Sequence, residues 1–236
     1  MKFSVPNLFQ RNSERPPAVS VVIPALNEED SIGEVIAEVR EFSPPGTEVL
    51  VVDNGSSDGT ALLSEAAGVR VVNQLLRGKG NAMRLGAEKA AGDILVFIDG
   101  DGSYPPEAIR SLVEPVSRGE EDIVYGSRFL GSGVDGLPFW RIWGNRFLSR
   151  TASVLYGKTT DLLTGFFAIR KDRFRGLGLV SGGFEIEAEI FVKSRKSGCR
   201  IREVPIRFRR RGGVSKLKLW RDGTRIFRFL LRPGLR

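Results

Sequence analysis

Short runs of apolar residues alternate, along the first half of the chain, with segments whose apolar residues recur at helical spacing. The apolar runs are Ala18–Ala25, Glu48–Asp53, Val69–Gln74, Asp93–Asp99 and Asp122–Gly126. Continuous runs of this length are typical of strands that are buried on both faces of a sheet. The segments with helical spacing are Ser31–Phe42, Thr60–Ala67, Lys79–Ala91 and Pro106–Ser117. The alternation predicts an α/β fold, with a mostly parallel twisted sheet flanked by helices.

The pattern becomes looser beyond Gly136. It predicts helices over Phe139–Tyr156 and Glu185–Ser197, a strand over Arg200–Arg209 and a basic amphipathic helix over Leu217–Leu231. At the other end, Met1–Pro17 is polar and has no sustained apolar run, so we expect a mobile leader there and no signal peptide. No run approaches the roughly 20 apolar residues of a membrane-spanning helix.

Composition removes several kinds of site. The 236 residues are 41% hydrophobic and 27% charged, as in a globular protein. Histidine is absent and Cys199 is the single cysteine, which excludes disulfides, Ser–His or Cys–His catalysis and zinc sites built from these residues. Any divalent metal must therefore be bound by oxygen ligands, which favours Mg²⁺ or Mn²⁺.

Charge is distributed unevenly between the two parts of the chain. Residues 1–136 carry 12 Lys and Arg against 21 Asp and Glu, whereas residues 137–236 carry 24 against 7. The basic part indicates an anionic partner, which could be a phosphorylated substrate, an anionic lipid or a nucleic acid. We expect the protein in the cytoplasm, or peripherally attached to the cytosolic face of a membrane.

Acidic residues follow two of the predicted strands. Asp53 ends one of them, and Asp99-Gly100-Asp101 ends another. Ligands of parallel sheets bind beyond the carboxyl ends of the strands, where these residues should meet. Two carboxylates two residues apart can hold one hard cation, and that cation can bridge a diphosphate. Taken alone, the motif favours a solvated acidic turn, because Asp-x-Asp often occurs by chance.

Three further segments have a functional and a structural interpretation. Asp53–Thr60 is either close to a nucleotide or a turn that caps the next helix. Pro24–Glu28 follows the first strand and could simply start a helix with acidic residues near its positive end. Arg77–Asn81 is either a basic turn that faces a phosphate or a helix entry.

The order and spacing of these segments resemble the family 2 glycosyltransferases of GT-A fold. The matching stretches, from Val21 to Phe129, are VVIPALNEE, VVDNGSSDGT, RGKGNAMRLGAEKAAGDILVFIDGDGSYPPE and YGSRF. In the second half, DLLTGFFAIRKD, GFEIEAEI, EVPIRFRRRGGVSKL and RDG resemble the dolichyl-phosphate mannose and glucose synthase branch. Many members of that branch continue into transmembrane helices, whereas this chain stops at Arg236 and is expected to be the soluble catalytic form.

The resemblance implies a role for each matching residue. Pro24, Leu26 and Glu28 would line the nucleotide pocket, with Asp53 near the base. Asp99, Gly100 and Asp101 would surround the metal and the diphosphate, and Arg128 would face the phosphates. The acceptor phosphate is expected at Arg141, Asn145 and Ser215. A basic loop with Arg210, Ser215 and Lys216 would close on the donor, although Arg209–Arg211 could also be a solvated charge run.

The same resemblance suggests a division of the chain. Residues 18–213 would form the GT-A domain, with a nucleotide-sugar half over 18–130 and an acceptor half over 131–213. Residues 214–236 would form a basic amphipathic C-terminal segment. Where the family often has Asp-Ala-Asp, this chain has Asp-Gly-Asp, and the changed residue carries no metal ligand.

The implied reaction is inverting transfer of a hexose from a UDP- or GDP-linked donor to a polyprenyl or dolichyl phosphate. A phosphate acceptor is already ionised, so the enzyme needs to align the reactants and neutralise charge but needs no base. A hydroxyl acceptor, on a glycan or a small metabolite, would need a base. Glu185, Glu187 and Asp161 are the candidates for that alternative.

A non-catalytic membrane- or RNA-binding module is an alternative from a different class. The chain has no nucleic-acid-binding motif, so we expect no nucleic-acid partner. Two segments rich in aromatic and basic residues, Leu137–Tyr156 and Lys216–Arg236, contain all three tryptophans. We expect both to dock on an anionic membrane surface; otherwise the two helices pack on the sheet.

Overall fold

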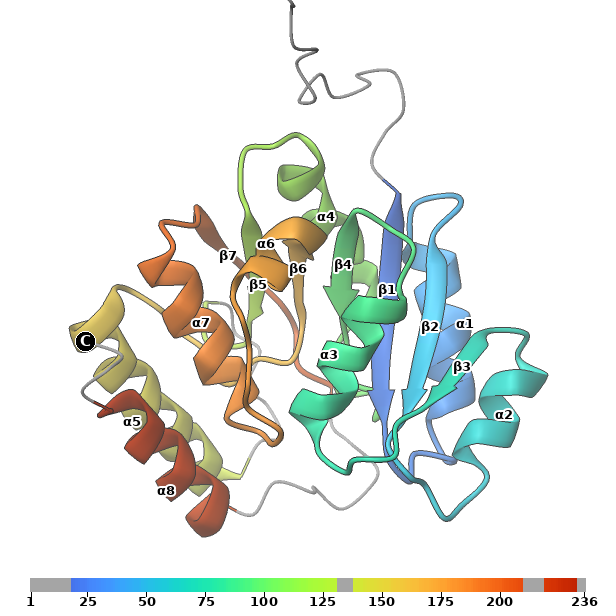
Figure 1. Cartoon of the computed structure of the whole chain (residues 1–236), viewed down its shortest axis with the longest axis horizontal. Helices are drawn as coiled ribbons and strands as arrows, with labels where there is room; N and C mark the ends of the chain where they lie inside the picture. The colour runs from blue at the N-terminus through green and yellow to red at the C-terminus, as the bar shows by residue number, and fades with distance from the viewer. Residues whose placement is uncertain (1–17, 131–137, 210–218, 233–236) are drawn as a thin grey trace, which may run out of the picture.

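The computed structural model describes residues 18–130, 138–209 and 219–232, and for Leu219 and Trp220 the backbone alone (Figure 1). The described residues form one seven-stranded sheet in the order β3-β2-β1-β4-β6-β5-β7. Its strands are β1 (Val19–Ala25), β2 (Glu48–Asp53), β3 (Arg70–Asn73), β4 (Ile94–Phe97), β5 (Ile123–Ser127), β6 (Phe167–Arg170) and β7 (Ile201–Pro205). The five strands predicted in the first half are all present. The predicted leader, 1–17, lies outside the described residues.

Helices cover both faces of the sheet (Figure 1). They are α1 (Ile32–Phe42), α2 (Thr60–Ala66), α3 (Lys79–Lys89), α4 (Ile109–Ser117) after a short 3₁₀ turn η1 (Pro106–Ala108), α5 (Phe139–Tyr156), α6 (Lys171–Gly176), α7 (Ile186–Lys196) and α8 (Leu219–Leu230). Successive residues of β1 point to opposite faces, so Val21 packs with α1 and α4 while Val22 packs with α3. The apolar run in β1 therefore supplies two hydrophobic cores at once.

The register of the parallel strands brings the ends of β1, β2 and β4 to one edge of the sheet. Ala25 pairs with Asp53, and Val22 pairs with Phe97. The chain therefore leaves β2 and β4 on the same side, and Asp99 follows the last residue of β4 by two positions. This confirms the expectation that the acidic strand ends lie at one edge.

One strand in the middle of the sheet runs the other way. β6 is antiparallel to both neighbours, with Phe97 opposite Phe167 and Ile123 opposite Ile169. The sequence pattern did not predict it. Phe167–Arg170 has only four residues, three of them apolar, and so short a run does not distinguish a strand from part of a helix. The predicted strand Arg200–Arg209 is shorter in the structure, where β7 ends at Pro205 and Ile206 makes one further bond to the Ser127 carbonyl at 3.0 Å.

The two aromatic–basic helices, α5 and α8, differ in what they expose. On α8, the apolar residues Ile226, Phe229 and Leu230 are buried in the core that also holds α5 and α7. On α5, in contrast, a set of large apolar side chains is more than half exposed: Phe139, Trp140, Trp143 and Phe147. The expectation of two membrane-facing segments is therefore wrong for the described apolar face of α8, which packs on the protein. No helix of the described part combines the length and apolarity that crossing a bilayer requires.

Candidate active site

A cavity of about 330 Å³ opens at the carboxyl ends of β1 and β4. Its wall brings together nine of the residues that the sequence assigned to a site: Pro24, Leu26, Glu28, Asp99, Gly100, Asp101, Arg128, Arg141 and Asn145. They come from four separate parts of the chain, and sheet register and the placement of α5 bring them together. Two groups of charged side chains dominate this wall.

The first group, the Lys79 cluster, consists of Lys79, Asp99 and Glu187. The ammonium nitrogen of Lys79 lies 2.7 Å from Asp99 Oδ1 and 2.7 Å from Glu187 Oε1. The side chain of Lys79 is only 11% exposed and that of Glu187 3%. Burial by itself would lower the pKa of Lys79, but the two carboxylates raise it above its ordinary value, so the residue stays charged. Burial raises the pKa of Glu187. The cluster holds two carboxylates for one cation.

Glycines place Lys79 at this point. A side chain at Gly78 would bring its Cβ within 2.1 Å of the Gly182 carbonyl oxygen, and Gly78 also has a φ of 135°. On the other side, a Cβ at Gly165 would lie 2.6 Å from the Lys79 ammonium. Lys79, the first residue of α3, can reach the cavity wall because Gly78 before it in the chain and Gly165 beside it in space carry no side chains.

The Asp99–Asp101 turn fits a cation that takes part of its coordination from a substrate. Asp101 Oδ1 accepts hydrogen bonds from the backbone and the hydroxyl of Ser103, at 3.0 and 2.6 Å, which fix its orientation. No cluster of three or more Asp, Glu, Cys or His side chains capable of holding a metal occurs in the described part of the chain. Two carboxylates completed by diphosphate oxygens and water are a typical arrangement for Mg²⁺. The donor set therefore fits the expected metal.

The second group, the Arg128 cluster, consists of Arg128, Asp161 and Asn145. Two guanidinium nitrogens of Arg128 each lie 2.7 Å from an oxygen of Asp161, in a bidentate pair. The Asn145 amide donates to Asp161 Oδ1 at 2.6 Å, and the Asp161 carboxylate is fully buried. Burial by itself would lower the pKa of Arg128, but Asp161 raises it further above its already high value. Here one carboxylate balances one cation, and it also fixes the helix α5 through Asn145.

The three residues considered as bases are all paired with cations. Asp161 is bound by Arg128, and Glu187 by Lys79. Glu185 Oε1 accepts from Arg225 on α8 at 2.9 Å. Each carboxylate therefore already has a structural partner, and two of the three are buried.

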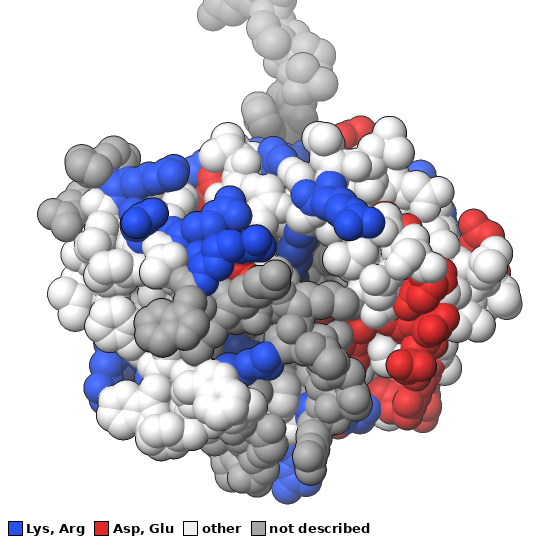
Figure 2. Space-filling model, turned by 90° about the horizontal axis from the view of Figure 1, so that it is seen from below, with Lys and Arg blue, Asp and Glu red and all other residues white. Residues whose placement is uncertain are grey.

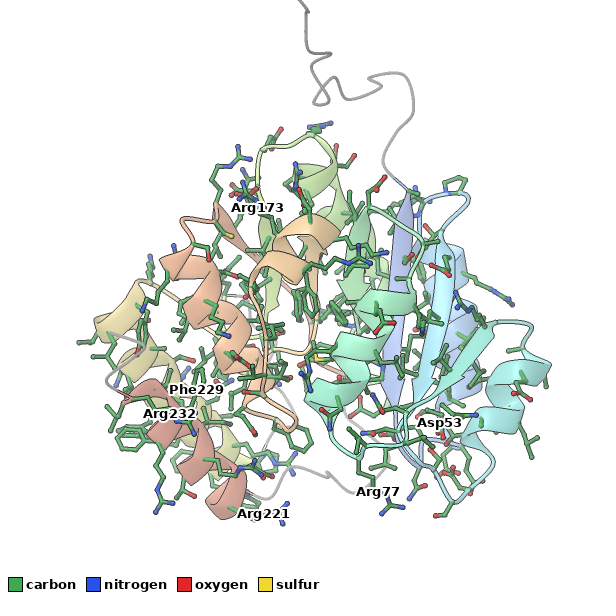
Figure 3. The ribbon with its side chains drawn as sticks, in the orientation of Figure 1. Asp53, Arg77, Arg173, Arg221, Phe229 and Arg232 are labelled. Atoms are coloured by element: carbon green, nitrogen blue, oxygen red, sulfur yellow. The ribbon has the colours of Figure 1, made fainter. Side chains whose placement is uncertain are left out.

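One predicted site residue lies apart from this cavity. The Asp53 carboxylate accepts hydrogen bonds from the backbone N–H groups of Gly55 and Ser56, at 3.3 and 3.2 Å, so it shapes the turn after β2. Arg77 reaches the same turn and donates to the Gly55 carbonyl at 3.2 Å (Figure 3). Arg210, Ser215 and Lys216 lie outside the described residues. The neighbouring Arg209 forms ion pairs with Glu38 and Glu107.

Sequence analysis missed several residues of the wall. Tyr104 accepts a hydrogen bond from the Gly165 N–H at 2.8 Å, and its ring lies against the Arg128 guanidinium. Asn54 joins the end of β2 to α3 by accepting from the Gly78 N–H at 3.1 Å. For Lys79, the signal is the basic turn at Arg77–Asn81, which can be interpreted as a turn that faces a phosphate. Tyr104 gave no comparable signal.

The face that contains the strand ends is electrostatically divided. In Figure 2, Lys and Arg side chains gather on the left and upper part of this face and Asp and Glu side chains on the right. The division reflects the sequence, because α5, α7 and α8 belong to the basic part of the chain and α1 and α2 to the acidic part. The basic side suits an anionic substrate or surface.

The chain is similar to known proteins over most of its length. Residues 20–178 match the model of glycosyl transferase family 2. Glycosyltransferase AglJ of Haloferax volcanii is 34% identical over 221 residues, which cover 92% of this chain and 72% of that protein. Dolichol-phosphate mannosyltransferase of Pyrococcus furiosus is 34% identical over 90% of this chain and 61% of its own length. Dolichyl-phosphate hexose transferase of H. volcanii is 30% identical, covering 92% of this chain and 94% of that enzyme.

The fold is also similar to solved structures. Glucosyl-3-phosphoglycerate synthase from Mycobacterium tuberculosis, in complex with Mn²⁺ and UDP-glucose, has a TM-score of 0.76 and 25% sequence identity. The match covers 91% of this chain and 78% of that one. The same enzyme has also been solved with phosphoglyceric acid, at a TM-score of 0.74.

Proposed function

Because the chain belongs to glycosyl transferase family 2, we propose that it transfers a hexose from a nucleotide diphosphate sugar to a polyprenyl phosphate. Relatives named for dolichol-phosphate mannosyl transfer and dolichyl-phosphate hexose transfer support this acceptor. The H. volcanii hexose transferase supports it further, since this chain covers 94% of that enzyme's length. The donor class is supported by the structural neighbour that holds UDP-glucose.

The observation that carries the choice of acceptor is the pairing of the three candidate bases. A hydroxyl must lose a proton during transfer and needs a base, whereas a phosphate monoester is already ionised. Asp161, Glu187 and Glu185 are each held by a cation, at 2.7, 2.7 and 2.9 Å. Drawing a proton to any of them would break an ion pair, and two of these pairs are buried. The site is thus better suited to an anionic nucleophile.

In the proposed reaction, an oxygen of the acceptor phosphate forms a bond to the anomeric carbon of the donor. The bond from that carbon to the diphosphate oxygen breaks, and its electron pair leaves with the nucleoside diphosphate. Attack from the opposite side inverts the anomeric configuration. A Mg²⁺ or Mn²⁺ ion held by Asp99 and Asp101 would neutralise charge on the leaving diphosphate. Arg128 would orient the donor phosphates, while Arg141 and Asn145 would bind the acceptor phosphate.

The test is a transfer assay with the full chain. UDP- and GDP-linked hexoses are screened with a polyprenyl phosphate in detergent, and the labelled sugar is measured in the organic phase. We expect transfer that stops with EDTA and returns with Mg²⁺ or Mn²⁺. Transfer to glycan or small-molecule hydroxyls, with none to the lipid phosphate, would reject the proposed acceptor. Full activity after exhaustive chelation would reject the metal.

A membrane-bound acceptor requires the enzyme to reach a bilayer surface, and we assign that contact to α5. Phe139, Trp140 and Trp143 project from its outer face with 71%, 61% and 59% of their surface exposed. Arg146 and Arg150 are exposed on the same helix. Aromatic rings beside arginines suit the headgroup region of an anionic membrane. The proposed location is the cytosolic face of the membrane.

Liposome co-sedimentation tests this contact. Binding should increase with the fraction of anionic lipid, weaken with salt and drop when Trp140 and Trp143 are both changed to Ala. Leu75→Ala is the matched control, because Leu75 is 93% exposed but lies between β3 and α3. Recovery of the protein in the supernatant with and without anionic vesicles would reject docking.

A further inference from the structure

We propose that Glu203, on the edge strand β7, is a positioning residue that sets the direction of the Arg128 guanidinium in the cavity wall. Glu203 itself does not line the cavity, and it acts through Thr160 and Ser127. The inference rests on the proposed function, in which Arg128 orients the donor phosphates, and adds to it a residue outside the site. In the described part of the chain, β7 is the last strand of the sheet and pairs with β5 alone (Figure 1).

Within the described residues, the Glu203 carboxylate gives all its hydrogen bonds to one short segment. Its Oε1 accepts from the Thr159 hydroxyl at 2.7 Å and from the Thr160 N–H at 2.9 Å. Its Oε2 accepts from the Thr160 hydroxyl at 2.6 Å. No described Lys or Arg forms an ion pair with Glu203, whereas Arg202, next to it on β7, pairs with Glu121 at 3.1 Å. The carboxylate therefore binds the two threonines and is not half of a surface ion pair.

Thr160 and Ser127 each precede a member of the Arg128 cluster. Thr160 is followed by Asp161, and Ser127, the last residue of β5, is followed by Arg128. The hydroxyl oxygens of Thr160 and Ser127 lie 2.6 Å apart. Because the Thr160 hydroxyl donates its proton to Glu203, Ser127 is the donor in this second bond. The two dipeptides are thus joined at their hydroxyls and again, one residue later, by the ion pair.

The direction of the guanidinium depends on where the Asp161 backbone lies. A bidentate pair fixes the angle between its two partners as well as their distance, and both nitrogens of Arg128 lie 2.7 Å from Asp161. Asp161 belongs to the connection between α5 and β6, outside any helix or strand. Groups held by strands are placed more precisely than groups on loops. The bonds to Glu203 tie this connection to a strand, so they set the position from which Asp161 meets Arg128.

The two threonines separate a positioning role from a purely structural one. Each hydroxyl donates one bond to Glu203, at 2.7 Å from Thr159 and 2.6 Å from Thr160, but only the Thr160 hydroxyl also bonds Ser127. Valine at either position keeps the branched shape of the side chain and removes one hydroxyl bond to Glu203. A structural role predicts the same consequences from both variants. A positioning role predicts a loss of transfer from Thr160→Val alone.

The experiment measures transfer and urea denaturation for Glu203→Gln, Thr160→Val and Thr159→Val in the full chain. A misplacement of about 1 Å can cost about 10²-fold in rate, and a smaller one should lower kcat/KM for the nucleotide sugar about tenfold in the first two variants. KM for the polyprenyl phosphate should stay within about twofold. Thr159→Val should be destabilised as much as Thr160→Val but keep kcat/KM within about twofold. Arg202→Gln, on the same strand, is the control for a surface change and should transfer normally.

A double-mutant cycle with Arg128→Lys shows whether Glu203 acts through the guanidinium. Lysine keeps the positive charge but cannot form the bidentate pair. In that background Glu203→Gln should therefore cost less than about twofold in kcat/KM. The same cost in both backgrounds, or equal losses of transfer from the two threonine variants, would overturn the positioning role. If Arg128→Lys did not fold, the comparison of the threonine variants would decide by itself.

Failure of the proposed function gives a different result. If the wild type transferred to no lipid phosphate, the proposed acceptor would be rejected. Affinity for UDP or GDP in the presence of Mn²⁺, measured by calorimetry, would then decide the role of Glu203, because Arg128 faces the diphosphate whatever the acceptor is. Weaker binding in Glu203→Gln and Thr160→Val, with normal binding in Thr159→Val, would support the positioning role. Equal affinity in all three variants would overturn it.

Discussion

The Lys79 and Arg128 clusters lie in the wall of the same cavity, and each places a buried cation against carboxylate. They differ in their balance of charge. Asp99 and Glu187 share the single ammonium of Lys79, whereas Asp161 and Arg128 match one to one in a bidentate pair. A balanced buried pair is costly to break and holds neighbouring elements in place. In the Lys79 cluster, carboxylates outnumber cations, so this cluster can bind a further cation. We therefore expect loss of Asp99 from the first cluster to affect mainly activity, and loss of Asp161 from the second to affect mainly stability.

Asp99→Asn should have the largest effect on turnover. Removing this carboxylate takes away half of the proposed metal site, and transfer should fall by about 10² to 10³. Unfolding free energy should change by less than about 1 kcal/mol, because Lys79 keeps its bond to Glu187. Asp172→Asn is the control, since Asp172 pairs with Arg170 and its side chain is 63% exposed. Near-normal turnover of Asp99→Asn at limiting metal would contradict the assignment.

Asp161→Asn should have the largest effect on stability. It leaves the Arg128 guanidinium buried with an uncharged partner, and breaking a buried pair in this way costs about 3 to 5 kcal/mol. Urea denaturation of this variant and of Asp99→Asn measures the difference directly. If Asp99→Asn proved the less stable of the two, the assignment of roles to the clusters would have to be reversed.

Arg141→Ala probes the wall next to the Arg128 cluster. Loss of a charge-assisted hydrogen bond to the acceptor phosphate should raise KM for the acceptor about tenfold to hundredfold. Donor affinity should stay within about twofold. Arg118→Ala, at the exposed end of α4 and outside the cavity wall, should change neither. Equal effects of Arg141→Ala on donor and acceptor would place this arginine at the diphosphate instead.

A third group of paired carboxylate and cation, outside the cavity, serves as a reference. The Asp122 carboxylate accepts from the backbone N–H of Arg200 at 2.9 Å and from the Arg173 side chain at 3.2 Å. Burial alone would raise the pKa of Asp122, but the bonds from Arg200 and the charge of Arg173 lower it below 3.8. The ionised Asp122 carboxylate therefore stabilises the folded state above pH 3.8, and this contribution is lost as pH falls through the lowered pKa.

Asp122→Asn should consequently lower the free energy of unfolding by roughly 1 kcal/mol at neutral pH, and by progressively less below pH 4. Denaturation of wild type and variant across this range measures the effect. If Asp122→Asn loses less unfolding free energy than Asp161→Asn, burial of the arginine, and not pairing alone, explains how much the Arg128 cluster contributes to stability. A constant difference across pH would contradict the lowered pKa.

The parallel part of the fold was predictable because buried strands such as Glu48–Asp53 are continuous apolar runs. The rule that ligands bind at strand ends then brought Asp99 and Asp101 to the site. β6 was not predictable, since its apolar run is short and no local pattern marks its antiparallel direction. Its place between β4 and β5 is set by packing between distant segments.

The sequence also could not predict which charged side chains pair inside the cavity. Lys79 and Glu187 are 108 residues apart, and no local pattern connects them. Helices α5 and α8 are both rich in aromatic and basic residues, and that composition does not say which face meets protein. In the structure, Ile226 of α8 is buried and Trp143 of α5 is exposed, a difference that comes from how the two helices are stacked.

The antiparallel β6 has a consequence for how the chain is made. β4 and β5 leave the ribosome well before Phe167–Arg170, yet β6 alone joins them, opposite Ile94–Phe97 on one side and Ile123–Tyr125 on the other. Until residue 170 has emerged, the edges of β4 and β5 that will later pair with β6 have no partner strand. Open edges of apolar strands invite pairing with other chains. The interval between synthesis of β5 and of β6 is thus the period when the growing polypeptide most needs protection.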